Sequence, residues 1–264
     1  MISRRRAVPA ALFSLAAIGL VAAVVTSCSL LNPASPTETV TDASGQASEV
    51  DWADYPGEGT LDPEDVLAAP RAEDVEAHAE QVLADLQAAV DAQQPGLAWS
   101  RGLEGGVYPH EGNGYGGATM HRTLNSAEVL TTEVPQDWPA TVAVVEAALA
   151  EHGYGPVQWD FEREPYPEET AEERDAEIRS TNGSLDAAQM WQWMGNANDG
   201  SMWVTVMLVD VDRGVGAPAD AEQVTPRMLG FMVGGTVISA ADEQAYRDGV
   251  APFEGLERPA PTHS

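Results

Sequence analysis

The chain has only one cysteine, Cys28, in 264 residues. A single cysteine cannot form an intramolecular disulfide, so a folded domain in this chain has to be stabilised by its hydrophobic core and its hydrogen bonds alone. Hydrophobic residues make up 44% of the sequence, which is enough to build such a core. The length predicts a chain that folds as one globular domain of ordinary size or as two small ones.

Residues 1–27, which precede Cys28, have the three parts of a secretory signal peptide. Arginines at 4–6 give a basic start, residues 7–25 form an apolar run, and small residues follow. An apolar run of about 20 residues is also long enough for a transmembrane anchor, so the sequence after it has to separate the two. That sequence is Val-Thr-Ser-Cys at 25–28, which resembles a bacterial lipobox. We expect residues 1–27 to be cleaved and Cys28 to be lipidated.

The lipobox resemblance also implies where the protein works. Lipoproteins with this motif carry a diacylglycerol on the cysteine, often with a third acyl chain such as palmitate. Each buried CH2 contributes about 0.8 kcal/mol of membrane affinity, so two or more chains hold a protein stably where one would not. We therefore expect a lipoprotein that is attached to the cell membrane through Cys28, with its folded part on the extracytoplasmic side of the cell envelope.

The charge of the chain excludes two classes of partner. There is no lysine, and 13 arginines stand against 42 acidic residues, which gives a net charge of -29. Removal of residues 1–27 takes away three arginines and no acid, so the remaining chain has a net charge of -32. A protein this acidic cannot build the cationic face that nucleic acid or anionic lipid requires. The expected partners are the membrane, through lipid on Cys28, and an envelope protein or small-molecule ligand that the sequence does not identify.

The segment after the cysteine has the composition of a flexible tether. Residues 28–60 are rich in Ser, Thr, Pro and acidic residues, and they bury too little surface to offset the entropy of the chain. Some thirty residues of this kind would hold the domain about 30 Å from the bilayer on average. Trp52 and Tyr55 are exceptions within this tether, and they have the size to dock on the domain.

Residues 61–255 are expected to form a single globular domain. It contains an acid-rich stretch at 162–182, interrupted by prolines, which we interpret as a solvated insertion that is partly helical. The last residues, 256–264, include Pro259 and Pro261 and are expected to be a disordered tail.

Hydrophobic periodicity predicts two amphipathic helices, at 72–93 and 139–152. Asp137 and Pro139 favour the start of the second helix, and Gly153 favours its end. Alternation of apolar and polar residues predicts strands at 97–101, 118–124, 157–162, 190–194, 201–209 and 227–238. The most hydrophobic of these, at 201–209, should be central, and the Asn-Asp-Gly that precedes it indicates a hairpin with a loop at 195–200. The predicted class is α+β, with an antiparallel sheet of about five to six strands and two amphipathic helices packed on one face.

Known catalytic and metal-binding motifs are incomplete in this sequence. His110-Glu111 begins a zinc-protease H-E-x-x-H motif, but Gly114 occupies the position of the second histidine. The glycine-rich run at 105–117 lacks the lysine of a phosphate-binding loop. Asp210-Val211-Asp212 begins like a calcium loop, but Val215 stands where such a loop needs glycine. No G-x-S-x-G motif is present. We therefore expect no catalytic residue, no bound metal and no cofactor.

The glycine-rich run is nevertheless the best candidate for a binding loop. It is expected to be a flexible surface loop, and aromatic residues among glycines offer contact area on an adaptable backbone. The candidate binding residues are Tyr108, His110, Glu111, Tyr115 and His121. The tryptophans at 191, 193 and 203 are expected to form core contacts or cross-strand pairs in preference to a sugar platform.

Beyond the lipobox, the chain resembles the LppA-like lipoproteins of actinobacteria. The resemblance rests on Pro-Gly-Leu-Ala-Trp at 95–99 after an amphipathic helix, the glycine-rich stretch, and Val-Pro-x-x-x-Trp-Pro at 134–139 opening the next helix. The chain departs from that family in having no paired cysteines after the signal peptide and in its acidic insertion. The family has no assigned function, so the resemblance supplies no catalytic residues.

These observations favour a membrane-anchored extracytoplasmic lipoprotein with a non-enzymatic binding or interaction domain. The alternative is an envelope hydrolase or metal-dependent enzyme that uses the region of His110, Glu111 and His121.

Overall fold

A computed structural model of the chain describes residues 34–41, 45–102, 104–217 and 227–262. The expected signal peptide and Cys28 lie outside these described residues. The fold is α+β, as the sequence predicts, and its centre is an antiparallel sheet of eight strands, which is larger than the five to six expected. Among the described residues, no helix is long and apolar enough to cross a membrane.

The strands of the main sheet follow the order β3-β6-β10-β9-β8-β7, and β5 joins β10 and β4. Their bounds are β3 Trp99–Arg101, β4 Gly106–Pro109, β5 Arg122–Asn125, β6 Val129–Thr131, β7 Gln158–Trp159, β8 Gln192–Asp199, β9 Met202–Asp210 and β10 Arg227–Val237. One edge of β10 pairs with β9 along its whole length, and the other edge pairs first with β6 and then with β5. At the change between them, Ser126 exchanges two hydrogen bonds with the backbone of Val233, both 2.9 Å long.

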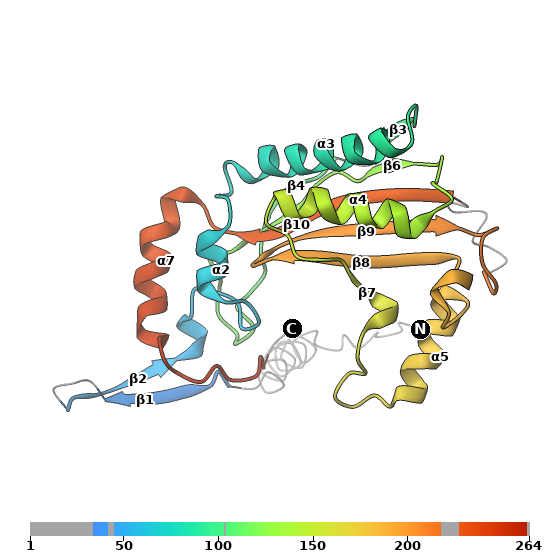
Figure 1. The fold of residues 1–264 in the computed structure, drawn as a ribbon. Helices are drawn as coiled ribbons and strands as arrows, with labels where there is room; N and C mark the ends of the chain where they lie inside the picture. The colour runs from blue at the N-terminus through green and yellow to red at the C-terminus, as the bar shows by residue number, and fades with distance from the viewer. Residues whose placement is uncertain (1–33, 42–44, 103, 218–226, 263–264) are drawn as a thin grey trace, which may run out of the picture.

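Two long helices, α3 (Val75–Gln93) and α4 (Trp138–Glu151), cover one face of this sheet (Figure 1). The apolar stripe of α3 predicted from the sequence is buried, from Val75 to Val90. Asp137 caps α4 by accepting a hydrogen bond from the backbone of Ala140 at 3.0 Å. The two helices pack on the buried side chains of the central strands, which are Val204, Val206, Leu208, Leu229, Phe231 and Val233.

The central hairpin is tighter than the sequence indicated. Asp199 pairs with Met202, so only Gly200 and Ser201 form the turn between β8 and β9. Residues 195–199, expected to lie in a loop, belong to β8. The register of this hairpin puts Asn198 beside Trp203 and Asn196 beside Thr205 on the face of the sheet opposite to α3 and α4.

Several short elements surround the sheet. The helices are α2 Pro63–Ala68, α5 Ala171–Asn182 and α7 Glu243–Val250, and the 3-10 helices are η2 Trp52–Asp54, η3 Asp160–Glu162, η4 Ala187–Gln189, η5 Ala240–Asp242 and η6 Ala251–Phe253. The expected strand at 157–162 is shorter than predicted, because the chain turns into η3 after Trp159. The acid-rich stretch contains α5, which is attached to the domain through buried Ile178 and Asn182.

The expected tether differs most from the structure. Within 34–60, β1 (Thr37–Thr41) and β2 (Ala47–Asp51) form an antiparallel hairpin that projects from one end of the molecule (Figure 1). Trp52 and Tyr55 are each only 2% exposed and pack with Tyr115 and Phe253 in a second, aromatic core. The described residues from Pro36 to Thr60 therefore belong to the folded domain, because these two aromatic side chains bury enough surface to order them.

The expected disordered tail is also part of the fold over its described length. The carbonyl of Pro259 accepts a hydrogen bond from the hydroxyl of Tyr115 at 2.9 Å. The backbone amide of Thr262 donates to the carbonyl of Gly114 at 2.8 Å. Residues 256–262 thus lie against the glycine-rich loop and close the aromatic core.

Candidate functional site

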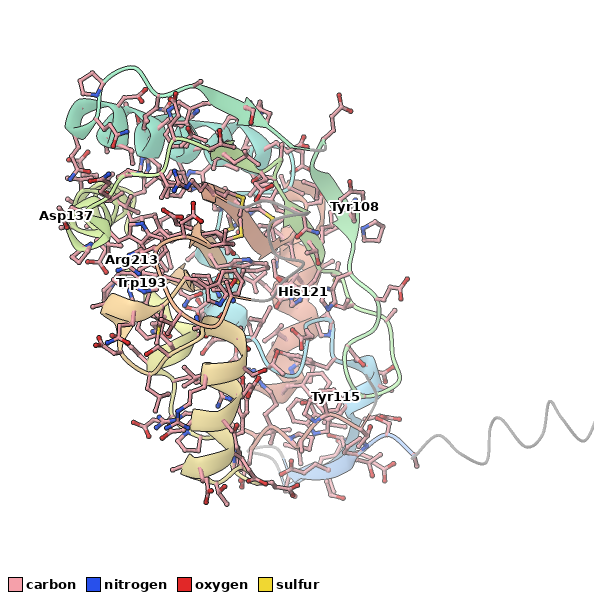
Figure 2. All side chains as sticks on the ribbon, turned by 90° about the vertical axis from the view of Figure 1, so that its right-hand side faces the viewer. Tyr108, Tyr115, His121, Asp137, Trp193 and Arg213 are labelled. Carbon is pink, nitrogen blue, oxygen red and sulfur yellow. The ribbon has the colours of Figure 1, made fainter. Side chains whose placement is uncertain are left out.

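The residues proposed as a binding loop do not form one site. Figure 2 shows Tyr108 at the surface on β4, with Tyr115 far from it along the loop. Tyr108 is 50% exposed and Glu111 is exposed, whereas Tyr115 is fully buried. His110 is half-buried, and its Nδ1 lies 2.9 Å from the hydroxyl of Thr123. The five residues therefore divide between the surface and the interior.

The glycine-rich loop is packed against the domain, so the prediction of a flexible surface loop is wrong. Asn113, which the sequence did not single out, is fully buried at its centre. Its side-chain amide donates to the carbonyls of Trp52, Ala53 and Tyr55 at distances of 2.8 to 3.1 Å. At Gly117, a Cβ would lie 1.7 Å from the carbonyl oxygen of Ala53. Glycine is required there by close backbone contact, and the composition of the loop reflects packing.

His121 is a buried histidine with a structural partner. It is 3% exposed, and its Nε2 lies 3.0 Å from the hydroxyl of Tyr246 on α7. Its Nδ1 is buried without a hydrogen-bond partner. Burial, and to a lesser extent the nearby His110, lowers the pKa of His121 to about 4. The ring is therefore neutral at physiological pH.

The metal-site alternative required His110, Glu111 and His121 to meet. The ring centroids of the two histidines are 6.3 Å apart, and the rings are nearly perpendicular. Within the part of the chain that the structure describes, no group of three or more His, Cys, Asp or Glu side chains is placed to hold a metal ion.

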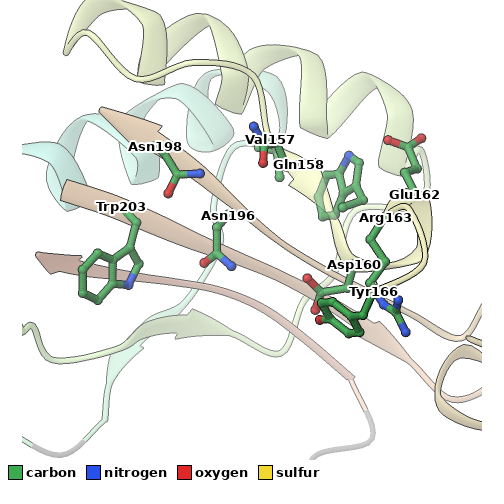
Figure 3. Close-up of a pocket in the computed structure, with 10 residues that line it drawn as sticks. Val157, Gln158, Asp160, Glu162, Arg163, Tyr166, Asn196, Asn198 and Trp203 are labelled. Atoms are coloured by element: carbon green, nitrogen blue, oxygen red, sulfur yellow. The ribbon is translucent and has the colours of Figure 1, made fainter. Parts of the chain in front are cut away.

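A cleft on the face of the sheet opposite to α3 and α4 offers a better candidate site. It has a volume of about 710 Å³, within the range of roughly 300 to 1,000 Å³ typical of small-molecule sites. Its floor is formed by β8 and β9, and one wall is formed by β7, η3 and the segment that follows (Figure 3). We call it the β8–β9 cleft. It is lined by Val157, Gln158, Trp159, Asp160, Glu162, Arg163, Tyr166, Asn196, Asn198 and Trp203.

Trp203 forms one end of the floor and is half-buried. A Cβ on Gly234 of β10 would lie 2.2 Å from Cε2 of its indole, so the ring lies across the backbone of the neighbouring strand. Any larger residue at 234 would push the ring off the sheet. Trp203 was expected to be a core or cross-strand tryptophan, as Trp191 and Trp193 are, each 8% exposed. Trp203 instead lies on the open face.

Amide side chains occupy the middle of the floor. Oδ1 of Asn196 accepts a hydrogen bond from the hydroxyl of Thr205 at 2.7 Å, which fixes the orientation of the amide and leaves its NH2 group for another acceptor. Among the described residues, the side chains of Asn198 and Gln158 have no hydrogen-bond partner. These three residues lie on neighbouring strands in register, because Asn196 is paired with Gln158 and precedes Asn198 by two positions.

The wall of the cleft is held by ion pairs of Arg163 with Glu177 on α5 and with Glu169, which precedes that helix. The Arg163 guanidinium donates to Glu169 at 2.9 Å and to Glu177, and it lies 4.3 Å from the centre of the Tyr166 ring. The hydrogen bond from Arg163 is the main reason that the pKa of Glu169 falls to about 2. The acidic insertion thus supports a tyrosine that is 64% exposed at the rim.

The charge of the cleft is negative. Asp160 and Glu162 contribute carboxylates to its lining, and Arg163 is neutralised by its two glutamates. Burial raises the pKa of Asp160, which the opposite effect of Arg163 only partly offsets. The cleft therefore combines an aromatic surface, planar amides and carboxylates. These groups suit a polar ligand, and they carry no free positive charge.

One feature of the sequence points to this site once the length of the β8–β9 turn is known. Polar residues at 196 and 198 and the tryptophan at 203 meet only if the turn is two residues long. Comparisons with known proteins add no assignment: no protein-family model, no curated protein and no solved structure matches the chain. The residues of the cleft are thus assigned from geometry alone.

Proposed function

We propose that the protein is a lipid-anchored, extracytoplasmic binding protein whose domain captures a ligand or partner without chemical conversion. The binding role rests on the β8–β9 cleft, where an aromatic ring and amide groups without a hydrogen-bond partner among the described residues face the solvent. The Val-Thr-Ser-Cys sequence at 25–28 supports the anchor. The resemblance to LppA-like lipoproteins is consistent with the anchor.

The first residues that the structure describes lie only a few positions after Cys28, which supports an arrangement with one end of the domain near the lipid. Eight residues run from Cys28 to Ser35, and they span at most about 30 Å however they are arranged. The domain end that carries the β1–β2 hairpin is therefore the end nearest the bilayer. Glu38, Glu49 and Asp54 are exposed there, so this end would be repelled by anionic headgroups. Membrane attachment accordingly depends on the acyl chains.

The anchor is tested with the variant Cys28→Ala, expressed with its signal peptide in a bacterium that processes lipoproteins. Wild-type protein should fractionate with membranes and incorporate labelled palmitate. The variant should incorporate none, and it should accumulate as a precursor or appear in the soluble fraction. A Ser29→Ala variant is the matched control, because it leaves the cysteine in place. Processed C28A protein that still fractionates with membranes would contradict the anchor.

The binding role makes a different prediction from the enzymatic alternative. Zinc binding by purified full-length protein, measured as a rise in Tm that is lost in His110→Ala, would support a metal-dependent enzyme and would count against the proposal. We expect no such shift, because His121 is buried against Tyr246 and Glu111 faces the solvent. Titration with divalent cations and metal analysis of the purified protein provide the measurement.

A further inference from the structure

We propose that the β8–β9 cleft is a carbohydrate site that binds a neutral oligosaccharide. The inference rests on the proposed binding role and names its ligand class, and it does not depend on the lipid anchor. The cleft contains the three kinds of group that recognise sugars: an aromatic ring presented by its flat face, planar amides that both donate and accept, and a carboxylate.

The aromatic surface is provided by Trp203. Its indole lies across Gly234 on the sheet, so the ring has one face on the backbone and the other toward the cleft (Figure 3). The C–H groups on one side of a pyranose ring form an apolar patch that packs against such a face. Gly234 has no side chain, so the indole rests directly on the backbone of β10. The aromatic surface therefore exists before the ligand arrives, and binding requires no ordering of this side chain.

The amides match the hydroxyl groups of a sugar. A hydroxyl donates one hydrogen bond and accepts others, so a pair of neighbouring hydroxyls is best met by an amide, which offers both kinds of group in one plane. Thr205 already holds Oδ1 of Asn196, so the free NH2 group of Asn196 is directed to an acceptor outside the protein. Asn198 and Gln158 flank it on either side, and Asp160 adds a carboxylate acceptor.

The length of the cleft favours more than one sugar ring. Figure 3 shows Trp203 at one end and Tyr166 at the other, with Asn196 and Asn198 between Trp203 and the wall. Tyr166 is stacked on Arg163 and exposes most of its ring, so it offers a second aromatic surface. A volume of about 710 Å³ exceeds what a single pyranose fills and suits a short chain of linked rings.

The charges of the cleft exclude anionic ligands. Asp160 and Glu162 are exposed carboxylates in its lining. The one cation in the lining, Arg163, is engaged by Glu169 and Glu177. A phosphate or an acidic sugar would face two negative groups without a free positive group, whereas a neutral sugar meets no such repulsion. A cationic peptide would also satisfy the carboxylates and would form a cation–π contact with the indole, so it is the competing occupant that the test has to separate from a sugar.

The test uses the full-length protein in detergent and three neutral trisaccharides, maltotriose, cellotriose and the trimer of N-acetylglucosamine. Trilysine serves as a cationic peptide probe. Binding is followed by intrinsic tryptophan fluorescence and by calorimetry up to millimolar concentration. We expect at least one trisaccharide to bind, with an affinity that changes little between low and high salt, because the contacts are between neutral groups.

Three variants locate the binding. Trp203→Ala should weaken it about tenfold or more, which is about 1.4 kcal/mol, because it removes the whole aromatic surface on which the sugar ring packs. Asn198→Ala changes only an exposed side chain, and it should weaken binding severalfold with the unfolding midpoint unchanged. Tyr108→Ala removes an exposed tyrosine on β4, outside the cleft, and should leave the affinity as in wild type.

Three outcomes would overturn the carbohydrate proposal. If trilysine binds, loses its affinity in salt and depends on Asp160, the cleft binds a cationic peptide; the binding role then survives and the ligand class is wrong. If a trisaccharide binds equally well to wild type, W203A and N198A, the sugar site lies elsewhere. Failure of all four probes to bind folded protein also counts against a sugar ligand. The proposed binding function itself would be contradicted by a different result, namely catalytic activity or zinc-dependent stabilisation.

Discussion

Replacement of Asn113 by alanine should be among the most damaging single changes in this domain. The side chain is fully buried in the glycine-rich loop. Its amide donates to three carbonyls of the segment 52–55, and its oxygen accepts from two amides of its own loop. The accepted bonds come from the backbone of Tyr115 at 2.9 Å and of Gly117 at 3.0 Å.

The cost follows from the number of groups that lose their partner. An amide has two hydrogens and two lone pairs, so at most four strong hydrogen bonds are present among the five contacts. Each contributes a net of about 0.5 to 1.5 kcal/mol, and a buried group left unsatisfied costs about 1 to 3 kcal/mol. Partial entry of water reduces the total. We expect Asn113→Ala to lower the free energy of unfolding by about 3 to 5 kcal/mol, a large part of the 5 to 15 kcal/mol typical of a domain.

Urea unfolding followed by tryptophan fluorescence gives this free energy directly, since Trp52 lies in the affected aromatic core. Asn113→Asp is an informative companion. It keeps an oxygen for the amides of Tyr115 and Gly117, but it turns a second oxygen toward the three carbonyls, so it should be nearly as destabilising as alanine. Asn198→Ala is the matched control, because the side chain of Asn198 is exposed and has no hydrogen-bond partner among the described residues.

Limited proteolysis supplies an independent measurement. In N113A, cleavage within 52–60 and within 110–119 should accelerate together, because the same side chain holds both segments. If N113A and N198A have the same urea midpoint, or if N113D is as stable as wild type, the argument that this amide holds the loop to the domain is refuted.

Two further predictions concern Arg213 and His121. The guanidinium carbon of Arg213 lies 5.3 Å from the ring centre of Trp193 (Figure 2) and 4.0 Å from that of Trp138, and the side chain donates to the carbonyl of Met190 at 2.6 Å. Arg213→Ala should lower the free energy of unfolding in urea by about 2 to 4 kcal/mol, and Arg213→Lys should recover little of it because an ammonium cannot reproduce the planar stack. Wild-type stability in R213K would contradict this. The pKa of His121 is 6.5 in the unfolded chain and about 4 in the folded one. The neutral ring therefore stabilises the fold fully above about pH 6.5, and this contribution, up to about 3 kcal/mol, is lost as the pH falls toward and below 4. His121→Gln should flatten the wild-type decline in stability between pH 6.5 and 4, and an unchanged slope would show that His121 does not titrate in this way.

The local elements were largely predictable because their signals are local. The stripe from Val75 to Val90 repeats at helical spacing, and every member of it is buried. Asp137 and Pro139 stand where a helix start needs them, and the cap of α4 is formed by Asp137. The alternation at 201–209 predicted a central strand, and β9 is flanked by β8 and β10. Short elements with weak periodicity, such as β4, β6, α2 and α7, gave no comparable signal.

The candidate site was not predictable in the same way, because it depends on the register of a hairpin. A loop at 195–200 would leave Asn196 and Asn198 outside the sheet. The two-residue turn at Gly200 and Ser201 instead extends β8 and sets Asn198 beside Trp203. A change of one residue in the register would move these side chains to the opposite face. Trp203 was predicted to form a core contact or a cross-strand pair for the same reason: the residue type shows only that the side chain is largely apolar, and the strand pairing decides which face of the sheet it occupies.

The sequence alone determined that no intramolecular disulfide can form, that the chain is strongly acidic, and which segments repeat with the period of a helix or a strand. These properties depend on neighbouring residues, so they can be read without knowing the fold. The tertiary structure decided what each face meets. It fixed the glycine-rich loop to the domain through contacts made by Asn113 with residues about sixty positions away. Among the described residues, it also left the β8–β9 cleft open on one face of the sheet, with Trp203 resting on Gly234. The burial of a polar side chain and the partial exposure of an aromatic one are set by long-range pairing, which no local pattern encodes.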